Sequence, residues 1–289
     1  MTNAAESRHA TPSLQRRRAA ARIWAVANQK GGVGKTTTAV TLAGELVRRG
    51  HRVLMVDLDP HGSLSTWFGQ DPDRTAASVY ALFQAARQGR EAGLRDHLLP
   101  TPIEHLFLVP ASTAQATLDR QVGAEEGMGL VLARALAGIR ADYDEILLDC
   151  PPMLGVLMVN ALAACERLLI PVQTEFLAIK GLERMLHTLA MIRRARGTRI
   201  DHLIVPTLFD RRTRASTETL ALLRETWPER LWNDLIPVDT RFRDASRRGV
   251  PLSLWQPASR GARAYARLTD HLLGQSEPRA TDGVREAHG

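Results

Sequence analysis

Short runs of apolar residues alternate along the chain with longer segments in which apolar positions recur every three or four residues. Most of the short runs are apolar throughout, which is typical of parallel strands that are covered on both faces. We predict strands at residues 23–28, 52–57, 106–110, 145–149, 168–172, 203–207 and 234–236. The longer segments predict helices, for example at 36–49 before Gly50 and at 181–196 before Gly197. This alternation predicts a doubly wound α/β fold with a mostly parallel sheet and helices on both faces.

The two ends of the chain lack this periodicity. Residues 1–22 are rich in Ala, Ser and Thr and contain a run of three arginines at 16–18, so we predict a disordered basic arm. The alternative is that the start codon is assigned too early and that these residues are a leader without a function. The polar residues 275–289 predict a disordered tail. With 289 residues and 44% hydrophobic content, the chain can bury one substantial core, which we place in a single domain at 23–274.

The composition favours an anionic partner and a reducing compartment. The net charge of +7 is typical of nucleic-acid binding, but arginine-rich chains also arise from genomic base composition, so the placement of the arginines must decide. Cys150 and Cys165 are the only cysteines and form no CxxC pair, which fits the cytosol. No apolar run reaches the length of a membrane span, and residues 1–22 lack the apolar centre of a secretory signal. We therefore expect a cytoplasmic protein without a membrane partner.

Two of the three lysines flank one glycine-rich loop. The loop reads Lys30, Gly31, Gly32, Val33, Gly34, Lys35, Thr36, Thr37. It follows a predicted strand and opens a predicted helix, where glycines let backbone N–H groups converge on phosphate oxygens and the helix terminus adds its positive end. Lys35 should reach the β- and γ-phosphates of a nucleotide, and the Thr36 hydroxyl should bind Mg²⁺. The general phosphate-loop pattern is not met, because Gln29 occupies its first glycine position.

The string K-G-G-x-G-K-T-T instead resembles the deviant Walker A motif of the ParA/MinD group of partition and positioning ATPases, which are P-loop NTPases. The resemblance implies a weak Mg²⁺-dependent ATPase with ATP and Mg²⁺ as cofactors and nucleotide contacts at residues 30–37. It also implies a homodimer that sandwiches ATP, in which Lys30 reaches the nucleotide of the partner while Lys35 serves its own. Both lysines would then be catalytic.

Three aspartates extend the resemblance. Asp57 and Asp59 form the D-x-D-P motif of the family after the second predicted strand; by resemblance Asp59 positions the attacking water and Asp57 supports the magnesium shell. Asp149 ends a Walker B-like strand and would hold Mg²⁺ through water. A carboxylate near the γ-phosphate can orient water or bind metal, although an Asp-x-Asp-Pro alone is also an ordinary turn at the end of a strand. Farther on, the backbone after the Ile-Pro corner at Pro237 would contact adenine, although Val-Asp follows it here in place of the more usual Arg-Asn.

Two arginine clusters follow the sixth and seventh predicted strands, at 211–214 and 241–248, so both should lie on one side of the molecule. The resemblance implies that Arg212 and Arg241 contact the DNA backbone without sequence preference, through contacts that weaken steeply with salt. The alternative is a solvated basic rim, or ion pairs with Asp210 and Asp244.

The resemblance predicts a positioning ATPase whose cargo adaptor stimulates hydrolysis. Residues 173–185 and 206–213 resemble the ParA-like ATPases of chemotaxis gene clusters, which favours chemosensory arrays as cargo, a ParP-like adaptor and a polar location. The alternative is chromosome or plasmid partition on the nucleoid with a ParB-like adaptor.

Other classes fit less well. A MinD-like membrane-cycling regulator needs a C-terminal amphipathic helix, and residues 275–289 have no apolar face. An iron-protein ATPase needs paired cysteines for a cluster, which Cys150 and Cys165 do not provide. No substrate motif suggests a metabolic ligase. His61 follows Asp-Pro, where many relatives carry Gln, and is expected to be a loop residue and not a zinc ligand.

Overall fold

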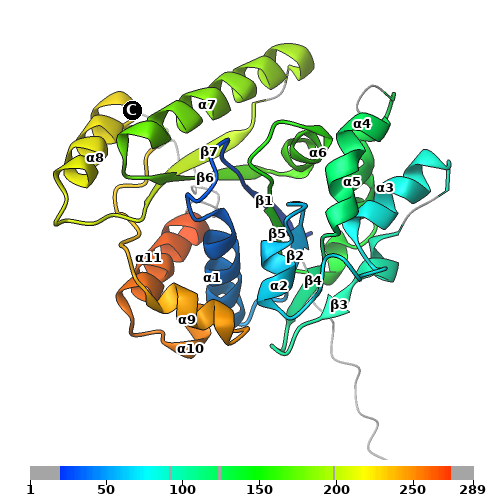
Figure 1. Cartoon of the computed structure of the whole chain (residues 1–289), viewed down its shortest axis with the longest axis horizontal. Helices are drawn as coiled ribbons and strands as arrows, with labels where there is room; N and C mark the ends of the chain where they lie inside the picture. Colours follow the sequence, from blue (N-terminus) through cyan, green and yellow to red (C-terminus); the bar gives the residue numbers. More distant parts are fainter. Residues whose placement is uncertain (1–19, 91–92, 123–124, 198, 275–289) are drawn as a thin grey trace, which may run out of the picture.

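The computed structural model describes residues 20–274 except 91–92, 123–124 and 198. These residues form a seven-stranded sheet in the order β3-β4-β2-β5-β1-β6-β7 (Figure 1). All neighbouring strands are parallel except β3, which is antiparallel to β4. The predicted doubly wound, mostly parallel sheet is therefore confirmed. The strands are β1 Arg22–Val26, β2 Val53–Asp57, β3 Leu99–Pro100, β4 Leu106–Val109, β5 Glu145–Asp149, β6 Arg167–Gln173 and β7 Asp201–Thr207.

Helices cover both faces of the sheet (Figure 1). Because neighbouring residues of a strand point to opposite faces, Ile23 and Ala25 join one buried cluster while Trp24 and Val26 join the other. Helices α3 to α8 contribute to the first cluster, and α1, α2, α9, α10 and α11 contribute to the second. The helices are α1 Lys35–Arg48, α2 Ser63–Trp67, α3 Val79–Arg87, α4 Leu118–Val122, α5 Val131–Ala137, α6 Val156–Ala164, α7 Phe176–Arg196, α8 Arg214–Thr226, α9 Arg241–Arg247, α10 Leu252–Trp255 and α11 Arg260–Gly274.

The predicted strand at 234–236 is wrong. Ile236 donates its N–H to the Pro206 carbonyl at 2.8 Å and accepts from the Phe209 N–H at 3.1 Å, and Val238 donates its N–H to the Phe209 carbonyl at 3.0 Å. These bonds form only an isolated parallel bridge between Phe209 and Pro237 and no continuous strand. The segment nevertheless runs beside β7, which keeps both arginine clusters at the same edge of the sheet.

Other details of the elements also differ from the prediction. The two-residue strand β3 was too short to show an apolar pattern, and α7 begins at Phe176, five residues before the predicted start. Ala21, assigned above to the disordered arm, donates its N–H to the Arg140 carbonyl at 3.0 Å, and Arg22 begins β1. Residues 1–19 of the predicted arm and the whole predicted tail lie outside the described residues.

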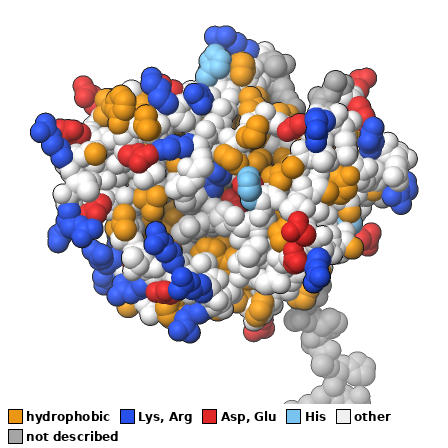
Figure 2. Space-filling model, in the orientation of Figure 1, with side chains coloured by type: hydrophobic (Ala, Val, Ile, Leu, Met, Phe, Trp, Pro, Cys, Tyr) orange, Lys and Arg blue, Asp and Glu red, His pale blue; other side chains and the backbone are white. Residues whose placement is uncertain are grey.

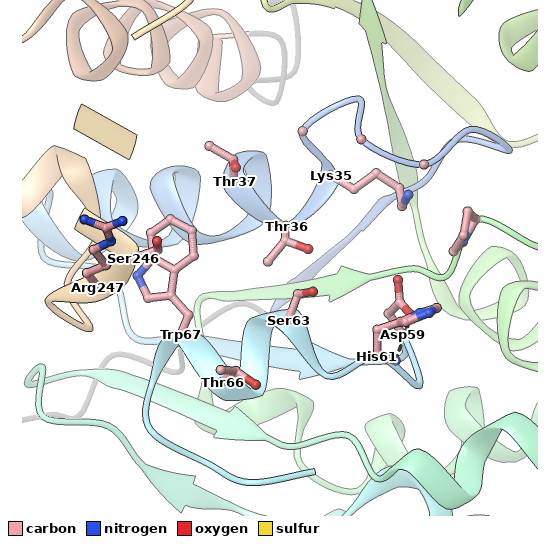
Figure 3. A pocket seen from close by; sticks show the side chains of 14 residues that line it. Lys35, Thr36, Thr37, Asp59, His61, Ser63, Thr66, Trp67, Ser246 and Arg247 are labelled. Carbon is pink, nitrogen blue, oxygen red and sulfur yellow. Dashed lines mark hydrogen bonds and ion pairs between the residues drawn. The ribbon is translucent and has the colours of Figure 1, made fainter. Parts of the chain in front are cut away.

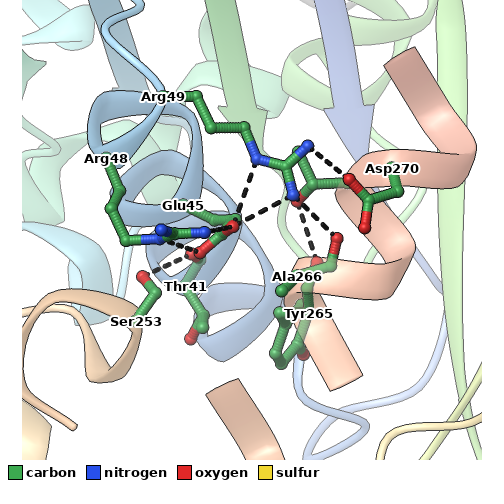
Figure 4. A network of polar contacts seen from close by, with 9 residues as sticks. Thr41, Glu45, Arg48, Arg49, Ser253, Tyr265, Ala266 and Asp270 are labelled. Carbon is green, nitrogen blue, oxygen red and sulfur yellow. Dashed lines mark hydrogen bonds and ion pairs between the residues drawn. The ribbon is translucent and has the colours of Figure 1, made fainter. Parts of the chain in front are cut away.

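Helix α1, which begins at the glycine-rich loop, is tied to α11 by a polar network (Figure 4). The buried Glu45 accepts hydrogen bonds from Arg48 at 2.6 Å and from Arg49 at 3.0 Å. Arg49 also donates to the Ala266 carbonyl at 3.0 Å and pairs with Asp270 at 2.8 Å. The network satisfies a buried carboxylate and fixes the end of α1 that lies away from the loop.

Among the described helices, none is both long enough and apolar enough to cross a lipid bilayer.

Candidate functional site

The glycine-rich loop joins β1 to α1 at the carboxyl edge of the sheet. Gly32 and Gly34 adopt φ of 75° and 89°, in the left-handed region where a β-carbon is costly. Gly34 caps α1 and has no side chain to accept the first N–H groups of the helix, and no side chain among the described residues is seen to accept them. Free N–H groups at a helix N-terminus, next to an open loop, form an anion site.

A cavity of about 920 Å³ lies above this loop (Figure 3). Its walls come from the loop, from the segment that follows β2, and from the end of α9. The lining residues are Gly31, Gly32, Gly34, Lys35, Thr36, Thr37, Asp59, His61, Ser63, Thr66, Trp67, Pro152, Ser246 and Arg247. The structure therefore brings most of the predicted loop residues and Asp59 together around one space.

Thr36 and Asp149 form the part of the site that suits a metal. The Thr36 hydroxyl donates to Asp149 Oδ2 at 2.7 Å, while Asp149 Oδ1 is buried without a hydrogen-bond partner among the described residues. Burial raises the pKa of the Asp149 carboxyl well above its usual range, and the charge of Asp57 raises it further. A hydroxyl and an unpartnered carboxylate oxygen are the hard ligands that Mg²⁺ prefers, so these residues fit the metal.

The hydrogen bonds of Asp57 differ from those expected for its predicted role, which is to support the magnesium shell. The register of β2 and β5 places it beside Asp149, but Ser65 donates its N–H at 2.8 Å and its hydroxyl at 2.7 Å to Asp57 Oδ2. Asp57 Oδ1 accepts the N–H of Asp59 at 3.2 Å. Burial raises the pKa of Asp57 to about 7. The carboxyl thus fixes the turn between β2 and α2, and this turn carries Asp59.

The two loop lysines point to different partners. Lys35 is buried beside the cavity and donates to the Lys30 carbonyl at 3.3 Å. Lys30 does not line the cavity and instead pairs with Glu175, which precedes α7. The side chains of the two lysines therefore have different partners, while their predicted roles toward a nucleotide stay predictions.

Helix α7 supports the first half of the loop, a contact that the sequence did not reveal. Gln29 Nε2 donates to Thr188 Oγ1 at 2.7 Å. A β-carbon on Gly181 would lie 2.9 Å from Lys30 Cβ and 3.0 Å from Asn28 Oδ1, so only glycine allows the helix this close. Gly181 was predicted as the first residue of the helix at 181–196, so nothing in the sequence indicated that it lies within a helix that begins at Phe176.

Pro237 separates two further cavities. Its neighbours Ile236 and Val238 line a cavity of about 180 Å³ together with Gly34 and Thr37 of the loop region. Pro237 itself lines a second cavity, of about 440 Å³, on the other side. The predicted adenine corner thus adjoins the glycine-rich loop through the residues around the proline.

The second cavity brings the arginine clusters together. Arg212 and Arg241 both line it, as does Arg260 of α11, which was not predicted. Arg212 already pairs with Asp210 at 2.6 Å, and its hydrogen bonds lower the pKa of that carboxyl to about 2. Arg241 lies 3.6 Å from Asp239. The ion-pair alternative therefore holds for Arg212 in this state, and Figure 2 shows many basic side chains over the α8, α9 and α11 side of this face.

Exposed apolar side chains flank the glycine-rich loop. Met153 and Leu154 follow β5, and Phe176 and Leu177 begin α7 after β6. Because β5 and β6 lie on either side of β1, the two pairs stand on both sides of the loop. Apolar groups grouped in this way on a surface are typical of a protein interface.

Comparison with known proteins decides the family. A family model described as AAA domain matches residues 21–202. The chain is 34% identical over 253 residues to the sporulation initiation inhibitor protein Soj of Bacillus subtilis, covering 87% of this chain and 98% of Soj. It is 38% identical over 259 residues to the chromosome-partitioning ATPase Soj of Thermus thermophilus, covering 89% and 98%. The chain belongs to the ParA/MinD-type family of partition ATPases.

Solved structures agree with this family fold. One from Mycobacterium smegmatis, described as cobyrinic acid a,c-diamide synthase with bound ATP analog and magnesium, has 34% identity and a TM-score of 0.73. It covers 88% of this chain and 94% of its own. The ParA/MinD-type cell division ATPase MinD of Pyrococcus furiosus, with a TM-score of 0.66 and 24% identity, shares the fold.

Proposed function

We propose that this protein is a positioning ATPase that closes into a dimer around ATP, binds DNA without sequence preference and releases it on hydrolysis stimulated by a cargo adaptor. The observation that carries the proposal is the cavity at the end of β1. There Lys35 and Thr36 line one space at the start of α1, and the Thr36 hydroxyl is hydrogen-bonded to the buried Asp149. ATP and Mg²⁺ are the ligands that this combination suits best.

Each residue of the cavity has a role in nucleotide binding. The backbone of residues 30–37 binds the phosphates, Lys35 pairs with the β- and γ-phosphates, and Thr36 and Asp149 hold the metal. Bound Mg²⁺ neutralises charge on the phosphates. The ATP analog and magnesium in the M. smegmatis structure support this arrangement. The cavity of about 180 Å³ beside Gly34 accommodates the adenine, with Pro237 setting the corner that shapes it.

Asp59 orients the attacking water, and Asp57 acts through Asp59. The Asp59 carboxylate lines the cavity that the γ-phosphate would enter. Asp57 holds the Asp59 N–H and Ser65, so it is a positioning residue whose link to the metal runs through its neighbour Asp149.

The dimer forms through the loop face. Lys30 reaches the nucleotide of the partner after leaving Glu175, and the exposed pairs Met153–Leu154 and Phe176–Leu177 supply apolar contact area around it. Burial of such side chains stabilises association by about 25 cal/mol per Å² of apolar surface, before the entropic costs of binding.

DNA binding is assigned to Arg212, Arg241 and Arg260 around the cavity of about 440 Å³. Arg241→Ala should weaken the affinity for DNA about tenfold in the presence of ATP, because one phosphate contact is lost. The slope of the logarithm of the affinity against the logarithm of the salt concentration should become smaller by about one. ATP turnover without DNA should stay at the wild-type rate. Fluorescence anisotropy of a labelled duplex over a salt series measures both quantities. Arg74→Ala, an equal loss of charge on an exposed residue outside that cavity, is the control; unchanged retention by Arg241→Ala would exclude the assignment.

The cargo is either a chemosensory array or a chromosome or plasmid. Residues 173–185 favour the array and a ParP-like adaptor, whereas the names of the Soj relatives favour chromosome partition and a ParB-like adaptor. Imaging a fluorescent fusion in cells with and without the array separates the two. A signal that follows the array to the pole supports the first, and a nucleoid signal that ignores arrays and tracks origins supports the second.

A synthase is the alternative that the name of the M. smegmatis structure raises. Amide-forming synthases that take nitrogen from glutamine use a reactive cysteine. Here burial raises the pKa of Cys150 well above its usual range and that of Cys165 to about 12. A raised thiol pKa leaves less of the thiolate that acts as a nucleophile at neutral pH, which favours the partition ATPase.

A further inference from the structure

The turn after β2 holds only one oxygen of the Asp59 carboxylate. Asp59 Oδ1 accepts the backbone N–H of His61 at 3.1 Å and lies 2.9 Å from the ring nitrogen Nδ1 of the same residue. Within the described part of the chain, no donor meets Oδ2 (Figure 3). The two oxygens therefore differ: Oδ1 is fixed by His61, and Oδ2 is free to accept a new donor in the cavity.

We propose that His61 is a positioning residue for ATP hydrolysis, whose Nδ1–H holds Asp59 Oδ1 so that Oδ2 orients the attacking water. This assignment rests on the proposed ATPase function. The backbone N–H at position 61 would make its bond with any side chain, whereas the imidazole adds a second bond to the same oxygen. Two bonds to one oxygen restrict rotation of the carboxylate, and a fixed acceptor spends less of its time in unproductive orientations.

The surroundings leave this role to His61. Lys35 and Arg247 also line the cavity, but Lys35 donates to the Lys30 carbonyl, and in the described structure neither contacts Asp59. The Asp59 side chain is 14% exposed, whereas His61 is 81% exposed. So exposed an imidazole packs against little, and its pair with a carboxylate contributes little to folding. The effect of removing it should therefore appear in turnover and not in stability.

The test compares His61→Ala with His61→Gln in the full-length protein. Glutamine can donate its amide N–H to the same oxygen, so it should keep the restraint that alanine loses. We expect His61→Ala to lower kcat about tenfold, within the range that misplacement of a catalytic group costs. The affinity for a non-hydrolysable ATP analogue and the thermal midpoint should stay at wild-type values, and His61→Gln should recover at least half of the lost rate. His187→Ala, at an exposed histidine on α7 away from the cavity, is the control.

Two results would overturn the role of His61 and leave the proposed function intact. One is a kcat for His61→Ala equal to that of the wild type. The other is an equal loss of kcat in His61→Ala and His61→Gln together with a loss of analogue binding, which would show a structural disturbance. A wild-type chain that binds the analogue but never hydrolyses ATP would overturn the proposed function and the role of His61 together.

Discussion

At the scale of single residues, the buried carboxyls Asp57 and Asp149 link the site to pH. Burial raises the pKa of Asp57 to about 7 and raises that of Asp149 well above its usual range. Both groups therefore bind protons more tightly in the folded than in the unfolded chain. Their contribution to the free energy of unfolding is largest below the ordinary Asp pKa of about 4 and is lost as the pH rises through the folded value.

Asp57→Asn should reduce this pH dependence. In metal-free protein, we expect the melting temperature of the variant to fall less between about pH 5 and about pH 8 than that of the wild type, because one of the two raised groups is gone. Circular dichroism melts over that range measure the difference, and Asp73→Asn, at an exposed position, is the control. Parallel curves for Asp57→Asn and the wild type would show that Asp57 does not titrate in this range.

Among the residues of the site, some contacts could be predicted from the sequence and others could not. The loop, Asp59 and Asp149 were predictable because their spacing and strand–helix context specify a phosphate site. The pairing of Asp57 with Ser65 and of Lys30 with Glu175 was not, since these contacts depend on how α2 and α7 pack. Arg260 was missed because α11 meets the arginine cavity only in the folded chain.

At the scale of elements, the seven expected strands were found except for the segment at 234–236, which pairs through isolated hydrogen bonds beside β7. Continuous apolar runs identify buried parallel strands well, but they do not show how far a segment pairs with its neighbour, and a two-residue edge strand such as β3 leaves no periodic signal. Such local hydrogen-bonding details are decided by tertiary contacts.

The polar network that ties α1 to α11 leads to a prediction at the scale of elements. Arg49→Ala removes one of two cations from the buried Glu45 and the bond to the Ala266 carbonyl, so it should cost about 2 kcal/mol of unfolding free energy. Urea denaturation monitored by circular dichroism measures the loss. Asp270→Ala removes only the exposed partner of Arg49 and should cost less than about 1 kcal/mol. A loss for Arg49→Ala no larger than for Asp270→Ala would mean that Arg48 alone satisfies Glu45.

At the scale of the whole molecule, the proposed cycle uses two surfaces that lie near the same edge of the sheet. The glycine-rich loop and its apolar flanks belong to the nucleotide and dimer face, while Arg212, Arg241 and Arg260 border a different cavity. The small cavity beside Gly34 lies between them and is lined by Val238 and Asp239, which also line the arginine cavity. Nucleotide binding can thus reach the basic surface through residues that the two cavities share.

The central claim is that Lys30 serves the partner while Lys35 serves its own nucleotide. Light scattering with a non-hydrolysable ATP analogue tests it most directly, alongside measurement of analogue binding. The wild type should double its molar mass, Lys35→Ala should fail to bind the analogue, and Lys30→Ala should bind it and remain a monomer. A Lys30→Ala protein that doubles its mass like the wild type would contradict the account.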